Sequence, residues 1–222
     1  MPGTVASPDL VFVSPDSTLT EMIPVMEASG WFDLDSGLDT GTLTMTVGTL
    51  PLAERGGGQS AVPDRRNWLV VGADPEATFA PVHARRDLGL VAMVSTPPAD
   101  RSRAVLVGLH GFHTQASDPD RSFSLTLVDD WGIEDVMAVA WDAALRDGEQ
   151  IGLMIDLAVL DPVYEPGCLR TRPGGLSLRQ LCRAARWAGR QPGATVVALA
   201  KATSLSNLAQ VAMSFSAGLA AR

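Results

Sequence analysis

MIDLAVLDPVYEPGCLRTRPGGL, residues 154–176, is the stretch of the chain that decides its fold. The apolar run that starts at Ile151 ends in Asp156, which is typical of a buried strand that brings a carboxylate to the edge of a sheet. Three turn-forming pairs follow: Asp161-Pro162, Pro166-Gly167 and Gly174-Gly175. Leu176 and Ser177 then open an apolar-periodic segment. The stretch therefore predicts a strand, an ordered loop and a helix over 177–189.

The same alternation extends outward from this stretch in both directions. Strands are predicted at 10–13, 68–71, 90–94, 104–109, 122–128, 151–157 and 195–200, with a further possible strand near 43–47. Helices are predicted at 18–28, 76–86, 133–145, 177–189 and 206–220, and Pro24 is expected to kink or end the first of them. Strands that alternate with helices of this length predict an α/β domain with a mostly parallel sheet.

Composition excludes several classes of protein. The chain has 222 residues, is 46% hydrophobic and carries a net charge of −8, so we expect one domain over 1–222 with a sizeable core. The acidic balance argues against binding to nucleic acid or to an anionic membrane. No apolar run reaches the ~18 residues of a membrane span, and the N-terminus lacks a signal-peptide pattern. A cytoplasmic protein is the expectation, with Cys168 and Cys182 as ordinary thiols.

The motifs of this stretch resemble those of the ureohydrolase family of arginases and agmatinases. They are Asp156, Asp161-Pro162, Pro166-Gly167 and Gly174-Gly175-Leu176. The family pattern is Ser-x-Asp-x-Asp-x-x-Asp-Pro-x-x-x-Pro-Gly, followed by Gly-Gly-Leu. Earlier strands are similar to family strands too, and the resemblance is clearest over 68–212 and faint before 68. It implies a three-layer α/β/α fold with a mostly parallel sheet of the arginase-like type, and a truncated N-terminal part.

Family members hydrolyse guanidino compounds with two Mn²⁺ ions held by four Asp and two His, and the resemblance assigns a position to each ligand. Only Asp156 keeps a ligand side chain. The positions that have lost theirs are Pro75, Ser95, Pro97, Ala99 and Ala158. We therefore expect a dismantled metal site and no cofactor, although the family uses manganese.

Other polar residues are expected to line the vestigial cleft at the ends of the strands. They are Asp74, Asp156, Asp161, Lys201, His110 and His113. Lys201, the only lysine, stands where the family has a substrate-orienting Glu, and a Lys201–Asp156 salt bridge could replace the lost cation charge. His110 and His113 could form a relocated metal site, but a metal site needs three or four ligands, so the preferred interpretation is a polar loop whose histidines hydrogen-bond to the backbone.

Acidic residues also cluster at 129–135. Asp129 and Asp130 are expected at a helix N-cap, and Glu134 and Asp135 in the first turn that follows, where they would complement the helix dipole.

These observations predict a non-catalytic ureohydrolase-fold protein. Its role would be that of a structural or regulatory subunit in a homo- or hetero-oligomer with arginase-like subunits, and exposed apolar residues on helix 206–220 would support assembly. One alternative is a C–N hydrolase that acts on guanidino or amidine compounds through an altered metal site. Another is a small-molecule-binding module that uses the vestigial cleft.

Overall fold

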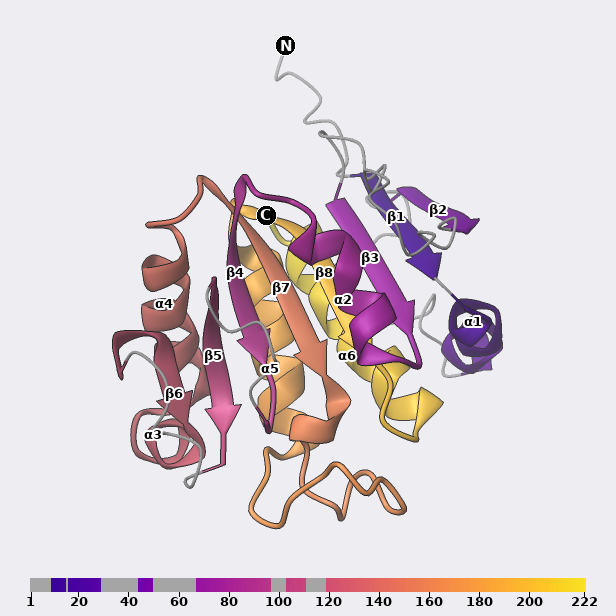
Figure 1. The fold of residues 1–222 in the computed structure, drawn as a ribbon. Coiled ribbons are helices and arrows are strands. Elements are labelled where there is room, and N and C mark those ends of the chain that lie inside the picture. Colours follow the sequence, from indigo (N-terminus) through magenta and orange to yellow (C-terminus); the bar gives the residue numbers. More distant parts are fainter. Residues whose placement is uncertain (1–8, 15, 29–43, 50–66, 97–102, 111–118) are drawn as a thin grey trace.

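Eight parallel strands form a single sheet in the computed structural model, which describes residues 9–14, 16–28, 44–49, 67–96, 103–110 and 119–222 (Figure 1). The strands are β1 (Asp9–Ser14), β2 (Thr44–Thr49), β3 (Asn67–Gly72), β4 (Leu88–Met93), β5 (Ala104–Leu109), β6 (Ser122–Ser124), β7 (Gln150–Asp156) and β8 (Ala194–Ala200). Their order across the sheet is β2-β1-β3-β8-β7-β4-β5-β6, and every pairing is parallel. All carboxyl ends therefore lie along one edge.

Helices cover both faces of the sheet and produce three layers (Figure 1). The helices are α1 (Thr18–Ala28), α2 (Pro75–His83), α3 (Leu125–Trp131), α4 (Ile133–Ala144), α5 (Leu178–Arg190) and α6 (Leu205–Ala220). One core joins apolar residues of α1, α3, α4, α5 and α6 to one face of the sheet. A second core joins Phe79 and Val82 of α2 to the other face. The predicted three-layer α/β/α fold is confirmed.

The central strands are apolar because both of their faces are covered. Every residue of β4 and of β5 is buried. Parallel strands between two helical layers cannot alternate polar and apolar residues, since neither face meets water. This is why the runs at 90–94 and 104–109 predicted strands correctly.

Helix starts in the second half follow local capping chemistry. Ser177 accepts a hydrogen bond from the Gln180 amide, and the Gln180 side chain accepts one from the Ser177 amide, which completes a capping box at α5. Ser204 caps α6 through the Asn207 amide. The predictions of helices at 177–189 and 206–220 are confirmed to within about one residue.

The prediction of a strand over 122–128 is wrong beyond its first three residues. The side chain of Ser124 accepts a hydrogen bond from the Leu127 amide at 3.4 Å and starts α3 there. Asp129 and Asp130 consequently lie in the last turn of a helix and not at an N-cap, whereas Glu134 and Asp135 do lie in the first turn of α4. The alternation of polar and apolar residues in SFSLTLV concealed the cap.

Pro24 does not end α1, which continues to Ala28. Pro24 has no amide to bond the carbonyl of Thr20, but both residues are exposed, so water can satisfy that carbonyl.

The expected apolar surface of α6 is largely absent. Its large apolar side chains Leu208, Val211, Phe215 and Leu219 are fully buried within the chain. No helix among the described residues has the length and hydropathy needed to cross a membrane.

Candidate functional site

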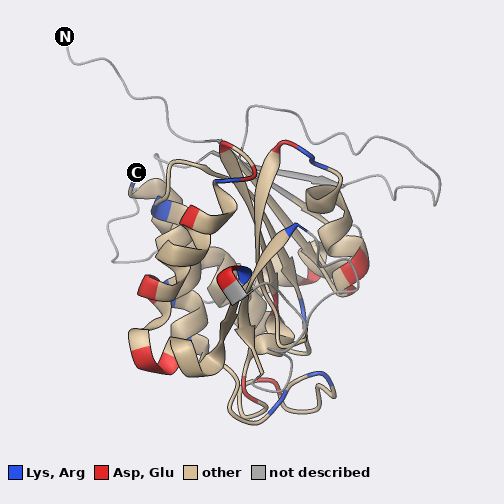
Figure 2. Cartoon of the chain, turned by 60° about the vertical axis from the view of Figure 1, so that its left-hand side comes forward, with Lys and Arg blue, Asp and Glu red and all other residues tan. Residues whose placement is uncertain are grey.

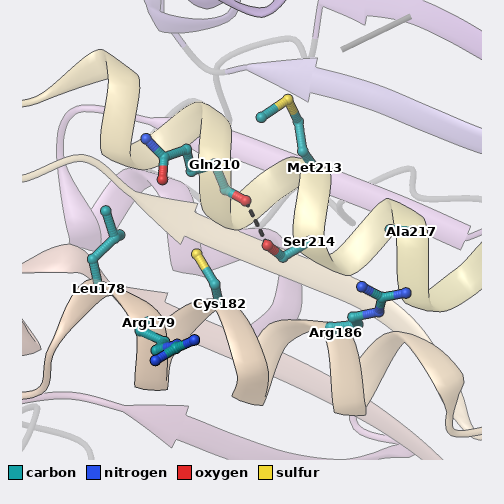
Figure 3. Close-up of a pocket in the computed structure, with 8 residues that line it drawn as sticks. All are labelled: Leu178, Arg179, Cys182, Arg186, Gln210, Met213, Ser214 and Ala217. Atoms are coloured by element: carbon teal, nitrogen blue, oxygen red, sulfur yellow. Dashed lines mark hydrogen bonds between the residues drawn. The ribbon is translucent and has the colours of Figure 1, made fainter. Parts of the chain in front are cut away.

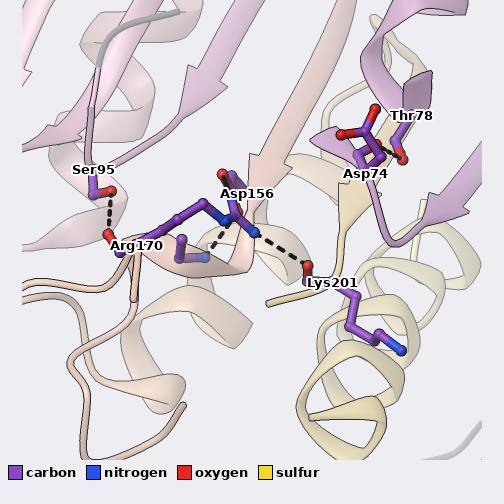
Figure 4. Close-up of polar contacts among 7 residues, drawn as sticks. Asp74, Thr78, Ser95, Asp156, Arg170 and Lys201 are labelled. Atoms are coloured by element: carbon purple, nitrogen blue, oxygen red, sulfur yellow. Dashed lines mark hydrogen bonds and ion pairs between the residues drawn. The ribbon is translucent and has the colours of Figure 1, made fainter. Parts of the chain in front are cut away.

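The candidate site lies at the edge of the sheet where β4, β7 and β8 end (Figure 4). Ligands of open parallel α/β sheets bind beyond the carboxyl ends of the strands, so this edge is where the fold would place chemistry. Asp156 ends β7, Ser95 follows β4 and Lys201 follows β8. The loop over 160–176, which hangs below these ends in Figure 1, contributes Arg170.

Asp156 is bonded on both of its carboxylate oxygens. Oδ1 accepts a hydrogen bond from the Ala158 amide at 2.9 Å, which caps the short 3-10 helix η4 (Leu157–Val159). Nη1 of Arg170 donates a hydrogen bond to Oδ2 and forms a close ion pair with it. The Asp156 side chain is 14% exposed and that of Arg170 is 43% exposed. The carboxylate is therefore the more buried partner, and the guanidinium lies on its solvent side.

Arg170 links three strand ends to one another. Its Nη2 donates to the carbonyl oxygen of Lys201 at 3.3 Å, next to the end of β8. Its own carbonyl accepts a hydrogen bond from Ser95 Oγ at 3.5 Å, next to the end of β4. A guanidinium presents several donors in a fixed plane, which suits this bridging role better than an ammonium does.

Burial governs the acidity of Asp156. Loss of hydration raises the pKa of its carboxyl above the ordinary value, while the Ala158 amide and the positive charge of Arg170 act in the opposite direction. The ionised carboxylate therefore carries a net cost of burial that its two partners do not fully offset.

The predicted Lys201–Asp156 salt bridge is wrong in its cation, because Arg170 takes that place. Nζ of Lys201 lies 3.9 Å from Oε2 of Glu21 on α1, and its side chain points away from Asp156 (Figure 4). Arg170 reaches Asp156 from a loop 14 residues further along the chain, a separation that no periodic pattern reports. The only available signal was an Arg between two turn motifs.

Three of the positions that the family resemblance assigns to missing metal ligands lie among the described residues. Pro75 is the first residue of α2, and Asp74 caps that helix by accepting the Ala77 amide at 2.8 Å. Ser95 and Ala158 are buried. Pro97 and Ala99 lie outside the described residues.

Of the two predicted cleft histidines, the structure describes His110. Nε2 of His110 lies 2.7 Å from the carbonyl oxygen of Pro173, so the tautomer with a proton on Nε2 donates to the backbone. This is the hydrogen-bonded arrangement that the sequence left open beside a metal site. His113 lies outside the described residues.

The loop over 160–176 is held by two carboxylates. Asp161 accepts hydrogen bonds from the amides of Val163 at 3.0 Å and Gly174 at 2.8 Å, and these bonds lower the pKa of its carboxyl. Glu165, which sequence reasoning missed, is completely buried. A charged residue directly before Pro166-Gly167 was the signal that could have found it.

The match to a family model covers the central part of the chain. The model described as the arginase family matches residues 61–202, which is more than half of the sequence. The chain belongs to the arginase family. No curated protein matches the sequence of this family member.

Solved structures share the fold of this arginase-family chain. The formimidoylglutamase of Bacillus subtilis is 12% identical with a TM-score of 0.72, over 99% of this chain and 89% of that one. The arginase of Bacillus subtilis is 13% identical with a TM-score of 0.70, over 97% and 99%. The agmatine ureohydrolase of Thermoplasma volcanium is 16% identical with a TM-score of 0.63, over 98% and 90%. These identities show a shared fold alone, and the truncated N-terminal part stays a prediction.

The described donors of this arginase-family chain do not fit a pair of manganese ions. Hard divalent cations need several carboxylate or imidazole ligands. Among the residues that the structure describes, no group of three or more His, Cys, Asp or Glu side chains could hold an ion. Asp156 is the one carboxylate among the positions that the family resemblance assigns to ligands, and it already forms an ion pair with the side chain of Arg170.

Proposed function

We propose that this arginase-family chain is non-catalytic and acts as a structural or regulatory subunit of an oligomer, either with copies of itself or with an active paralogue. The observation that carries the proposal is the ion pair between Asp156 and Arg170. Where the family resemblance places a metal ligand, this chain has a carboxylate neutralised by its own guanidinium.

Charge supports this interpretation. A dinuclear centre needs a cluster of negative ligands, since their charge offsets that of two divalent ions. Here the ligand positions carry Pro75, Ser95, Pro97, Ala99 and Ala158, none of which is charged. Arg170 would moreover repel an incoming metal ion from the one remaining carboxylate. The hydroxide that the family chemistry requires would have no pair of ions to acidify it.

Retention of the scaffold supports a role in assembly. The loop over 160–176 keeps its turn motifs and its hydrogen bonds although the ligands are gone. A fold that is maintained without its chemistry is suited to binding other subunits.

Metal content and hydrolysis test the proposal together. The full chain is produced in medium with added Mn²⁺, Ni²⁺ and Zn²⁺, purified by gel filtration, and analysed for metal by plasma mass spectrometry. Release of urea or ammonia from arginine, agmatine and formimidoylglutamate is then followed with added Mn²⁺. An arginase with all six ligands, handled in parallel, is the positive control.

We expect far less than one ion per chain and no turnover above that of the buffer. One or more ions per chain together with turnover would overturn the proposal and favour the altered hydrolase site. His110→Ala would then show whether that histidine holds the ion. A chain that stays monomeric both alone and when co-expressed with a paralogue bearing all six ligands would overturn the subunit role.

A further inference from the structure

A groove runs between α5 and α6 on the helical layer that covers the larger core (Figure 3). Its volume is about 500 Å³, and its lining is mainly apolar. Leu178, Cys182, Met213 and Ala217 provide the apolar surface, and Arg179 and Arg186 add positive charge. The two helices touch beside this groove, because a Cβ at Gly218 would lie 2.1 Å from the carbonyl oxygen of Arg186. The groove is thus built into a tightly packed helix pair.

Cys182 contributes an unreactive surface to the groove. Burial raises the pKa of its thiol, although a hydrogen bond with Ser214 acts in the opposite direction. Ser214 Oγ in turn donates to the Gln210 carbonyl oxygen at 2.8 Å, as Figure 3 shows. A protonated, half-buried thiol behaves as a small apolar group, so the groove is suited to contact and not to covalent chemistry.

The two arginines of the groove have no acidic partner among the described residues. Arg183, on the same helix but outside the groove, pairs with Glu134 at 3.1 Å. Arg179 and Arg186 are exposed and seven positions apart. At 1.5 Å per residue, this spacing sets their Cα atoms about 10 Å apart along α5. The groove therefore offers two available positive charges on either side of an apolar centre.

The α4 helix carries the complementary pattern. Asp135 and Asp142 are exposed, also seven positions apart, and neither forms an ion pair with a described residue. Val139 lies between them and is 45% exposed, and Trp131 at the end of α3 is 51% exposed. Figure 2, turned to this side of the molecule, shows acidic positions on these helices. This acidic α4 face, defined as Trp131, Asp135, Val139 and Asp142, matches the groove in charge and in spacing.

We infer that the α5–α6 groove is the docking site for the acidic α4 face of a second copy of this chain. Asp135 and Asp142 would meet Arg179 and Arg186, while Val139 would contact the apolar centre. Because α4 packs beside α5, two copies related by a two-fold axis can form this contact twice, whereas a single contact per copy builds a closed ring or an open chain of subunits. The inference rests on the assembly role proposed above and names the surfaces that would perform it.

Charge reversal on each surface separately tests the inference. The groove variant carries Arg179→Glu and Arg186→Glu, and the face variant carries Asp135→Arg and Asp142→Arg. Sedimentation equilibrium measures the self-association of each and of the wild-type chain. Arg146→Glu with Arg190→Glu is the matched control, since both arginines are exposed and lie outside the groove and the face. Far-ultraviolet circular dichroism checks that every variant is folded.

We expect the wild-type chain and the control to associate, and association to weaken as salt rises. Each reversal variant alone should associate at least tenfold more weakly, because like charges then meet. An equimolar mixture of the two variants should recover association, since every groove then has an oppositely charged face available. Recovery also excludes misfolding as the cause of the loss.

Three results would overturn the inference. They are a monomeric wild-type chain, unchanged association of the groove variant, and failure of the mixture to recover. A monomeric chain would leave the groove to a different protein or to a small organic anion. The metal and turnover measurements separate this failure from that of the proposed function. A monomer without metal or turnover contradicts the interface but not the loss of catalysis, and an assembled chain with metal and turnover contradicts the loss of catalysis but not the interface.

Discussion

Asp156 and Glu165 lie nine positions apart, and both carboxylates are largely shielded from water. They differ in how well their hydrogen-bond partners compensate for this burial. Asp156 has one amide and one guanidinium as partners, and burial still raises its pKa. Oε2 of Glu165 accepts hydrogen bonds from the Thr203 amide at 2.8 Å, the Thr203 hydroxyl at 2.5 Å and the Ser204 amide at 2.9 Å. Its Oε1 accepts from Asn207 Nδ2 at 2.8 Å. Glu165 is the better satisfied of the two although it is the more buried.

The difference distinguishes a carboxylate that holds the scaffold together from one at a position that the family resemblance assigns to a metal ligand. Glu165 ties the loop over 160–176 to the start of α6, where unpaired helix amides favour a negative charge. Asp156 lies where the family resemblance places a metal ligand. Its two partners offset only part of the cost of burying its charge. We therefore expect Glu165 to matter for stability and Asp156 to tolerate change.

The largest effect is expected for Glu165→Ala. The substitution removes the buried acceptor of four hydrogen bonds, one of them from the buried Asn207 side chain, so it should lower the free energy of unfolding by about 3–5 kcal/mol. Urea unfolding followed by tryptophan fluorescence measures the loss. Glu165→Gln keeps one oxygen acceptor and should cost about 1–2 kcal/mol.

An equal cost for the two Glu165 variants would mean that the negative charge, and not the number of acceptors, holds the loop. If Glu165→Ala lowered the free energy of unfolding by less than Asp156→Ala does, the comparison would be reversed and Asp156 would have the structural role.

Much of this arrangement could be predicted from the sequence, because strongly apolar strands and local caps leave local patterns. The run ending at Asp156 predicted β7, and Ser177 predicted the start of α5. The motif over 154–176 predicted the family. Each of these signals depends on residues within a few positions of one another.

The partners of Asp156 could not be predicted, since they depend on how a loop folds back over the sheet. Lys201 was the plausible cation because it follows the neighbouring strand β8. The backbone of Lys201 does reach the site, through its carbonyl bond to Arg170, but its side chain turns toward Glu21. Likewise, Glu165 meets α6 at a separation of about 40 residues, which leaves no periodic signal in the sequence.

A smaller effect is expected for Arg170→Ala. Loss of the guanidinium leaves Asp156 with one partner, so the free energy of unfolding should fall by about 1–2 kcal/mol, less than for Glu165→Ala. Arg172→Ala, an exposed arginine of the same loop, is the matched control and should change stability by less than about 0.5 kcal/mol.

Thermal unfolding of Arg170→Ala with added Mn²⁺ sharpens this result. One carboxylate makes a weak site, so we expect no stabilisation by the metal. A rise in Tm that saturates with Mn²⁺, and that wild-type protein does not show, would mean that Arg170 covers a functional metal site. The chain would then be an enzyme held closed and not one that has lost its ligands.

The smallest effect, and the finest test of the comparison, is the pH dependence of Asp156→Asn. Because the folded pKa of Asp156 is raised, the folded chain binds more protons than the unfolded chain between the ordinary Asp pKa, about 4, and the folded value. The contribution of Asp156 to the free energy of unfolding therefore falls as pH rises through this window. Asp156→Asn lacks that loss, so its stability relative to wild type should improve with rising pH and then level off.

Asp161 has a lowered pKa, so Asp161→Asn should show the opposite slope. Its free energy of unfolding relative to wild type should fall as pH rises from below the folded pKa toward about 4. Urea unfolding of the three proteins across this range measures both slopes. If Asp156→Asn instead shared the slope of Asp161→Asn, the attraction of Arg170 would outweigh burial, and Asp156 would be a stabilising ion pair of the same kind as the scaffold carboxylates.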